Sequence, residues 1–233
     1  MAAGSYTERR GQLQTYFDRT AVEAWKKLTS DAPVSRIRET VRAGRDRMRA
    51  TLLSWLPDDL RGSRLLDAGC GTGALAIEAA RRGANVVAID LSPKLVAHAR
   101  ELVTEALPGQ IEFRSGDMLD PALGEFDHVV GMDSLIHYSP EDALDVLEGL
   151  TTRTANSLLF TFAPRTPALA LMHAVGRLLP HRTDRAPAIH PVAEDRLKRM
   201  ITGTLGPAGW DVGRTERISS GFYTSQALEL QRR

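Results

Sequence analysis

The stretch "LLDAGCGTG", residues 65–73, combines residue types that can hold a charged small molecule. Gly69, Gly71 and Gly73 occupy alternate positions, and Asp67 closes the apolar run before them. Glycine lets the chain turn tightly and brings the backbone against a ligand. A carboxylate at this point repels a phosphate but attracts an ammonium group. The stretch therefore predicts a binding loop for a ligand that carries a charged amine.

A dinucleotide is the competing ligand for this loop. Gly69, Gly71 and Ala74 satisfy the relaxed fingerprint G-x-G-x-x-G/A, which holds the pyrophosphate of NAD. Two features depart from that fingerprint: Asp67 precedes the first glycine by two residues, and Gly73 comes one place early. NAD is thus the rival, and the amine-bearing ligand is preferred.

Two more acidic residues follow apolar runs of the same kind. Asp90 ends "ANVVAID", and Asp117 lies in "SGDM", which overlaps the end of "QIEFRS". Ligands of open α/β sheets bind beyond the carboxyl ends of the strands. We therefore expect Asp67, Asp90 and Asp117 to gather around one ligand.

The elements that position these residues alternate from residue 64 onward, which indicates βαβ units and a parallel sheet. Ser92 as N-cap and Pro93 at the first helical position mark the start of one helix. Parallel strands are expected at 64–68, 84–90, 110–115, 126–132 and 156–162, helices at 74–82, 92–107 and 193–205, and a hairpin of 210–218 with 222–231. The expected fold class is α/β, with a doubly wound, Rossmann-like, seven-stranded sheet.

Two segments lie outside this plan and suggest the domain division. Residues 1–60 are predicted to be a helical arm or lid, and 61–233 the ligand-binding domain. Within that domain, residues 164–192 form an insertion after the fifth strand, where we expect a substrate cap.

The arm contains "RIRETVRAGRDRMRATLLSWL", with an apolar stripe and an arginine stripe at helical spacing. The apolar stripe is Ile37, Val41, Met48, Leu52 and Trp55, and the other is Arg38, Arg42, Arg45 and Arg49. We interpret the arginines as a solvated helix face, with a docking surface for an acidic partner as the alternative.

The composition narrows the class of protein. The 233 residues carry a formal net charge of +1, which gives no reason to expect a nucleic-acid partner. A single cysteine, Cys70, allows no internal disulfide. The N-terminal residues have no apolar signal-peptide core, and no run approaches the roughly 20 apolar residues of a membrane span. We expect a soluble cytoplasmic protein.

The D-x-G-x-G-x-G arrangement from Asp67 to Gly73 resembles motif I of the class I S-adenosylmethionine-dependent methyltransferases. The resemblance implies that Asp67 helps to hold the methionine amine and that Asp90 hydrogen-bonds the ribose hydroxyls. It places Asp117 on the adenine amino group. Leu91 and Met118 would contact the adenine ring, and Asp133 completes the expected cofactor-binding set. The methyltransferases that modify amino groups of adenine or glutamine usually carry N/D-P-P-Y/F after strand four, whereas this chain reads "MDSLIHYSP". A small-molecule O- or C-methyltransferase is therefore preferred.

A narrower resemblance covers nearly the whole chain. The stretches "YFDRTAVEAW", "DSLIHY", "FAPRTPAL" and "GFYTSQALEL" resemble magnesium-protoporphyrin IX O-methyltransferase. That family methylates one propionate of the porphyrin on the route to chlorophyll or bacteriochlorophyll. The resemblance places the family's two implicated active-site residues at Tyr16 and His137. It implies no protein-bound metal, because the magnesium belongs to the substrate.

The same resemblance suggests which residues and partners serve the porphyrin. The expected substrate-binding residues are Phe17, Arg165, Met172 and Arg177, the last three from the insertion and its edge. Arg182 and Arg185 are further candidate partners of a carboxylate. Handover of substrate by the porphyrin-binding subunit of magnesium chelatase, and peripheral contact with photosynthetic membranes, are the partner and location expectations.

The chemistry of the acceptor decides the roles of Tyr16 and His137. A propionic acid has a pKa of about 4–5 and is ionised at neutral pH, so no proton must leave. We expect both side chains to orient the carboxylate by hydrogen bonding, with neither acting as an essential base. A phenol, such as a quinone precursor, would instead need His137 as a base. A module that binds S-adenosylmethionine without turnover is the third hypothesis.

Overall fold

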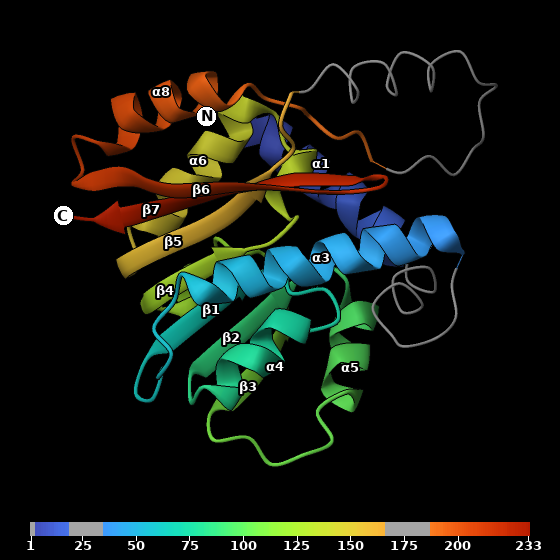
Figure 1. Ribbon diagram of the computed structural model, residues 1–233. Coiled ribbons are helices and arrows are strands. Elements are labelled where there is room, and N and C mark those ends of the chain that lie inside the picture. Colours follow the sequence, from blue (N-terminus) through green and yellow to red (C-terminus); the bar gives the residue numbers. More distant parts are fainter. Residues whose placement is uncertain (1–2, 19–34, 166–186) are drawn as a thin grey trace.

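Seven strands form one mixed sheet in the computed structural model, which describes residues 3–18, 35–165 and 187–233 (Figure 1). In chain order the strands are β1 (Arg64–Ala68), β2 (Asn85–Asp90), β3 (Gln110–Ser115), β4 (Phe126–Gly131), β5 (Thr154–Phe162), β6 (Trp210–Ser220) and β7 (Tyr223–Arg232). Their order across the sheet is β3-β2-β1-β4-β5-β7-β6. β1 to β5 run parallel, and β7 is antiparallel to β5 and β6. The predicted parallel strands with a C-terminal hairpin are confirmed.

The chain reverses its direction of travel across the sheet between β1 and β4. From β1 it moves outward to β2 and β3, then returns to place β4 on the other side of β1. At such a switch point the loops that follow neighbouring strands diverge and leave a crevice for a ligand. Asp67 pairs with Ala88 of β2 and Val130 of β4, so the ends of these three strands lie at one edge.

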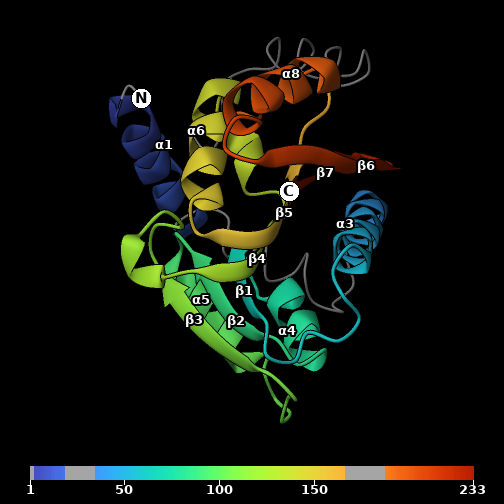
Figure 2. The same cartoon turned by 90° about the vertical axis from the view of Figure 1, so that its left-hand side faces the viewer.

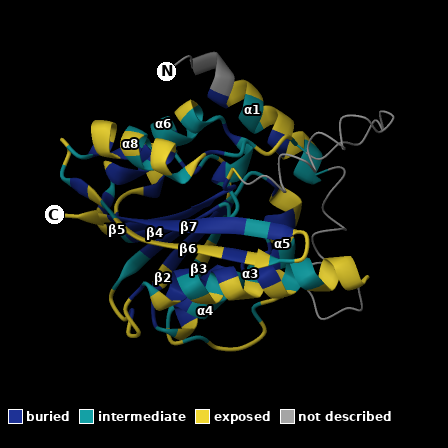
Figure 3. Cartoon of the chain, turned by 45° about the horizontal axis from the view of Figure 1, so that its top comes forward, coloured by how far each residue is buried: buried dark blue, intermediate teal, exposed yellow. Residues whose placement is uncertain are grey.

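Helices cover both faces of the sheet (Figure 2). They are α1 (Ala3–Tyr16), α3 (Arg36–Ser54), α4 (Ala74–Arg81), α5 (Pro93–Glu101), α6 (Pro140–Thr151) and α8 (Glu194–Leu205), with short 3-10 helices η2 (Pro121–Leu123) and η3 (Leu135–His137). α3 and α4 pack on one face, and α1, α6 and α8 lie on the other. Figure 3 shows the central strands buried and the outer sides of the helices exposed.

Each face has its own apolar core. Leu13 of α1, Leu147 of α6 and Ile201 of α8 belong to one cluster. Met48 of α3 and Ala79 of α4 belong to the second. The described part of the arm is therefore packed into both cores, and the proposed division at residue 60 stays a prediction.

Helix α3 bears out part of the predicted apolar stripe. Met48 and Leu52 are fully buried, whereas Ile37 in the first turn is 53% exposed. Gly44 lets the helix cross β7 closely, because a Cβ there would lie 2.5 Å from the Tyr223 ring. The Ser35 side chain caps the helix by accepting from the Arg38 amide at 3.5 Å.

Two helices differ from the sequence expectation. α5 ends at Glu101 instead of near residue 107, because the chain turns there to reach β3. α6 was not predicted, although it has the same start signal as α5. Ser139 accepts from the Asp142 amide at 3.1 Å, and Pro140 occupies the first helical position.

The two ends of the predicted insertion meet beside β5. Pro164 and Val192 form an isolated bridge, and the Val192 amide donates to the Ala163 carbonyl at 3.0 Å. Among the described residues, no helix is both long enough and apolar enough to cross a membrane.

Candidate active site

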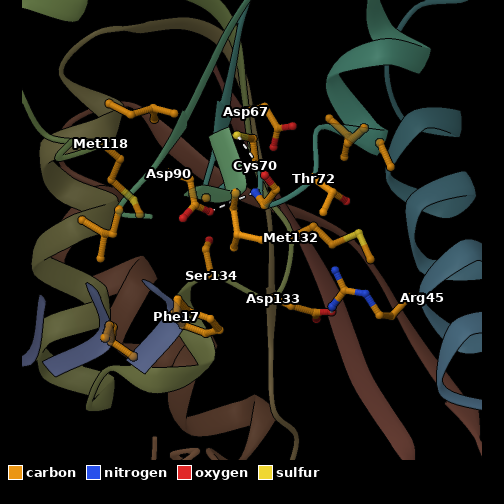
Figure 4. Close-up of a pocket in the computed structure, with 18 of the residues that line it drawn as sticks. Phe17, Arg45, Asp67, Cys70, Thr72, Asp90, Met118, Met132, Asp133 and Ser134 are labelled. Atoms are coloured by element: carbon orange, nitrogen blue, oxygen red, sulfur yellow. Dashed lines mark hydrogen bonds and ion pairs between the residues drawn. The ribbon is translucent and has the colours of Figure 1, made fainter. Parts of the chain in front are cut away.

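A cavity of about 280 Å³ opens at the carboxyl ends of β1, β2 and β4. Figure 4 shows Asp67 and Asp90 at one end of it, with Phe17 and Arg45 on opposite walls. Nine of the sequence-predicted site residues line this cavity: Phe17, Asp67, Gly69, Gly71, Asp90, Leu91, Met118, Asp133 and His137.

The glycine loop leaves room for a ligand at one specific position. Gly69 (φ 88°) has Ser134 behind it, since a Cβ would lie 2.5 Å from the Ser134 Cβ. Gly71 (φ 55°) has nothing within 4 Å of the place where a Cβ would stand, and it lines the cavity. Gly73 instead lets α4 approach Phe113, where a Cβ would lie 2.9 Å from the ring. Gly71 therefore provides the ligand cradle, and Gly73 has a packing role.

Asp67 is a buried carboxylate with an unused oxygen. The residue is 2% exposed, and Oδ2 has no hydrogen-bond partner among the described residues. Burial, reinforced by the nearby Asp90, raises the pKa of Asp67 to about 7. A buried acceptor without a partner is costly, and a cationic ligand would satisfy it. This environment fits the ammonium group of the expected cofactor.

The Asp90 carboxylate, at the end of β2, is oriented by two backbone amides. Its Oδ2 accepts from the Gly71 amide and its Oδ1 from the Ser92 amide, both at 2.9 Å. Burial raises the pKa of Asp90, and these two amide donors oppose the increase. The carboxylate is thus oriented beside Leu91, and the ribose role stays a prediction.

Asp117 lies next to the cavity but is not among its lining residues. Its Oδ1 accepts from the Tyr6 hydroxyl at 2.6 Å and from the Leu119 amide at 2.9 Å, and its Oδ2 pairs with Arg10. Helix α1 is therefore fastened to the residue expected to meet adenine. Oδ2 keeps one lone pair, so the adenine role stays a prediction.

Asp133, in the loop after β4, contacts three elements: α3, β5 and β7. It has a left-handed backbone (φ 54°), forms an ion pair with Arg45 of α3 at 2.6 Å, and accepts from Thr161, Tyr223 and Ser225. Its lining position fits a cofactor role, which stays untested. The contacts themselves indicate that Asp133 fastens α3 to the strand ends.

The arginine stripe of α3 is not a purely solvated face, so that interpretation was wrong. Arg42, Arg45 and Arg49 line the cavity, and the Arg45 side chain is only 18% exposed. Arg49 pairs with Asp46 at 2.9 Å. The helical spacing was visible in the sequence, but nothing there told which side of α3 faces the strand ends.

His137, in η3, faces Phe17 from α1. Their ring centroids are 5.9 Å apart, and Tyr16 packs edge-on against Phe17 at 5.3 Å. Tyr16 is half-buried and is not among the lining residues. The structure therefore brings the two aromatic residues and the histidine together. Figure 4 shows Phe17 at the end of the cavity away from Asp67.

The ring of His137 has a defined orientation. Its Nδ1 lies 3.4 Å from the Ala188 carbonyl oxygen, and because a carbonyl only accepts, Nδ1 carries the proton. Burial lowers the pKa of His137, so the ring is neutral near pH 7 and its Nε2 has a lone pair. In this tautomer Nε2 accepts, and it can donate to a carboxylate only when the ring is protonated. The expected orienting role of His137 stays a prediction.

Of the other predicted substrate residues, the structure describes Arg165, which is not among the residues that line the cavity. Arg165 is exposed, and its amide donates to the Val192 carbonyl at 2.9 Å. Met172 and Arg177 lie outside the described residues, as do Arg182 and Arg185. Lining residues without a sequence-predicted role include Thr72, Met132, Ser134 and Tyr138.

The strand order, the glycine cradle and the acidic residues at the ends of β1 and β2 define a class I S-adenosylmethionine-dependent methyltransferase. Two family descriptions match the sequence: "Methyltransferase domain" over residues 65–155 and "Magnesium-protoporphyrin IX methyltransferase C-terminus" over residues 131–232. The chain belongs to the magnesium-protoporphyrin O-methyltransferase family. This membership decides the cofactor question in favour of S-adenosylmethionine over NAD.

Individual relatives support the same placement. Magnesium-protoporphyrin O-methyltransferase of Rhodobacter capsulatus is 48% identical over 97% of this chain and 98% of its own length. A crystal structure of magnesium protoporphyrin IX methyltransferase from Synechocystis PCC 6803 with bound SAH superposes with a TM-score of 0.83 at 29% identity, covering 96% of this chain and 100% of that one. A ubiquinone biosynthesis O-methyltransferase of Xanthomonas oryzae is 38% identical, but over only 54% of this chain and 55% of its own.

Proposed function

We propose that this chain transfers the methyl group of S-adenosylmethionine to a propionate carboxylate of magnesium-protoporphyrin IX, giving the monomethyl ester in chlorophyll or bacteriochlorophyll biosynthesis. The observation that carries the proposal is the full-length match to the Rhodobacter capsulatus enzyme, which includes the segments outside the cofactor loop. The quinone enzymes share only about half of the chain.

The residues around the glycine loop would hold the methyl donor. Asp67 Oδ2 would accept from the amine, the open face of Gly71 would admit the methionine portion, and Asp90 would accept from the ribose. S-adenosylmethionine supplies an electrophilic methyl group on a sulfonium, and the chain supplies its position. Met118 and Leu91 provide the apolar wall for the adenine ring.

The opposite end of the cavity would receive the acceptor. Phe17 and His137 lie there, with Tyr16 behind them, and this grouping supports an acceptor site formed by the arm and the loop after β4. A carboxylate acceptor is already an anion, so these residues need only align it and exclude water. We propose that α1 serves as the lid of this site.

One observation favours a different acceptor and must be tested. The lone pair on Nε2 of neutral His137 suits a base, which a phenolic hydroxyl would require. A catechol quinone precursor is therefore the second candidate substrate.

Competing incubations test the proposal. The protein is mixed with labelled S-adenosylmethionine and magnesium-protoporphyrin IX, metal-free protoporphyrin IX, or a catechol quinone precursor, and the products are separated by chromatography. We expect label in a porphyrin monoester. Label in the catechol alone would assign the second function, and no transfer to any acceptor would favour a cofactor-binding module without turnover.

Two finer expectations extend the proposal. Handover from the porphyrin-binding subunit of magnesium chelatase and peripheral contact with photosynthetic membranes are consistent with a poorly soluble porphyrin substrate. Co-sedimentation with that subunit, and with anionic vesicles, measures each one separately.

A further inference from the structure

One guanidinium group connects three parts of the chain around His137. Arg9 of α1 donates from Nε to the His137 carbonyl at 2.8 Å. Its Nη2 lies 2.8 Å from Nε2 of His190 and 3.3 Å from the Ala188 carbonyl. Three parts of the chain therefore meet at this side chain: the arm, the η3 turn, and residues 187–192 at the end of the insertion, which we call the return segment.

The chemistry of these contacts fixes their direction. A guanidinium has donors only, so Nε2 of His190 must be the acceptor, and the His190 ring is neutral. Burial and the Arg9 charge lower the pKa of His190, which agrees with a neutral ring. The His190 amide also donates to the Ile136 carbonyl at 2.9 Å, so the return segment and η3 are linked through the backbone as well.

The Ala188 carbonyl is contacted by both Arg9 and His137. It accepts from Arg9 and also lies 3.4 Å from Nδ1 of His137, where it sets the tautomer of the ring. Arg9 thus contacts both the main-chain carbonyl of His137 and the carbonyl that orients its imidazole. A planar fork with several donors can make these contacts together, whereas a lysine ammonium cannot reproduce the geometry.

We propose that Arg9 is the positioning residue for His137, holding its ring so that Nδ1 donates to Ala188 and Nε2 is left for the acceptor. The inference rests on the proposed function and names a residue that acts through His137 without touching the reacting atoms.

The charge of Arg9 gives this role a specific signature. Among the residues that the structure describes, the charged and titratable side chains that act on His137 are Arg9 from α1, His190 from residues 187–192 and Asp133 from the loop after β4. Burial lowers the pKa of His137 most and the Arg9 charge lowers it further, whereas the hydrogen bond to the Ala188 carbonyl and the Asp133 carboxylate raise it. Removing the positive charge at position 9 should therefore move the titration of His137 to higher pH. A loss of burial would also raise this pKa, so a variant that keeps the charge is needed to separate the two causes.

Two variants separate the effect of the planar guanidinium fork of Arg9 from the effect of its positive charge. Arg9→Gln removes the charge and the fork, and Arg9→Lys keeps the charge without the fork. We expect Arg9→Gln to lower kcat about 10- to 100-fold, the range for a misplaced catalytic group. The pH midpoint of the His137 titration should rise in Arg9→Gln. The Kd for S-adenosylmethionine should stay within about twofold, because Arg9 is not among the residues that line the cavity. Arg9→Lys should lose turnover but keep the pH midpoint of the His137 titration. Added guanidinium should partly restore the turnover of Arg9→Gln.

A double-mutant cycle decides the proposal, with the exposed Gln14→Ala on the same helix as the control. In a His137→Ala background, Arg9→Gln should cost little further turnover. An equal loss with and without His137, or full activity of Arg9→Gln beside a crippled His137→Ala, would overturn the positioning role alone. Full activity of His137→Ala would overturn the proposed role of His137 itself, and the inference with it.

Discussion

Tyr6 of α1 donates a 2.6 Å hydrogen bond to Asp117, which follows β3, across 111 residues of sequence. Burial and the Asp117 carboxylate raise the pKa of Tyr6, so the phenol stays a donor at all physiological pH values. Tyr6 also stacks on Tyr138, with ring centroids 5.5 Å apart. Helix α1 is thus attached to the residue expected to bind adenine and to the loop that carries His137.

Tyr6→Phe should weaken the binding of S-adenosylmethionine by about 1 kcal/mol, because Asp117 loses one of the donors that orient it. Coupling is reciprocal, so cofactor should slow tryptic cleavage after Arg9 and Arg10 in the native protein more than in the variant. Calorimetry and timed proteolysis measure the two effects, with Gln14→Ala as control. Identical affinity and protection in Tyr6→Phe would separate the lid from the cofactor site.

Asp67 should make cofactor affinity depend on pH. Its raised pKa of about 7 means that the carboxyl is protonated in the free protein below that pH and must lose the proton to bind an ammonium group. Affinity should therefore fall as pH decreases from 8 to 6, by up to about tenfold per unit below the pKa. Calorimetry in buffers of different ionisation enthalpy should show proton release on binding.

Asp67→Asn is the matched variant, since it keeps the shape and removes the titration. Its affinity should be low and nearly independent of pH. A native protein whose affinity does not change over this range would show that Asp67 does not face the amine.

Asp90→Ala should weaken the binding of S-adenosylmethionine at every pH, by about 1–3 kcal/mol, the cost of leaving buried polar groups of the ligand without partners. The variant also removes the acceptor of the Gly71 amide, so a thermal unfolding curve must accompany the titration. Unchanged affinity would remove Asp90 from the ribose site.

The protonation state of His137 should distinguish carboxylate from phenol chemistry. Burial lowers its pKa in the free protein, and a carboxylate acceptor placed beside Nε2 would raise it, so acceptor binding should take up a proton. KM for the porphyrin should then rise as pH increases between about 6 and 8, while kcat changes little. A base would behave differently, because kcat would fall as pH decreases.

His137→Gln offers a permanent donor and no base. It should keep much of the activity that His137→Ala loses, and its KM should no longer depend on pH. Equal, deep losses in both variants, with an acidic limb in the native kcat profile, would contradict the orienting role.

The strands and the glycine loop could be predicted because their signals are local. An apolar run that ends in Asp67 or Asp90, followed by glycine or by a Ser-Pro helix start, specifies both an element and its end. The position of Gly71 in the cavity follows directly from that local pattern. Because the carboxyl ends of parallel strands meet at one edge of the sheet, the sequence also predicted that Asp67 and Asp90 lie close together.

The contacts of the arm could not be predicted, because they join residues more than 80 positions apart. The pairs Tyr6–Asp117, Arg9–His137 and Arg45–Asp133 depend on how α1 and α3 lie against the sheet. The spacing of arginines along α3 is identical whether that face meets water or a cavity. The hydrogen bond that sets the His137 tautomer depends on Ala188, which carries no sequence signal of its own.

The central claim is that the acceptor atom is a carboxylate oxygen, and the bond formed reports on it directly. Protein, methyl-labelled S-adenosylmethionine and magnesium-protoporphyrin IX are incubated, the porphyrin product is isolated, and mild alkali is applied. We predict one labelled methyl group per porphyrin and its release as labelled methanol, because a methyl ester hydrolyses under these conditions. Label that stays on the porphyrin through alkali would contradict a carboxylate acceptor.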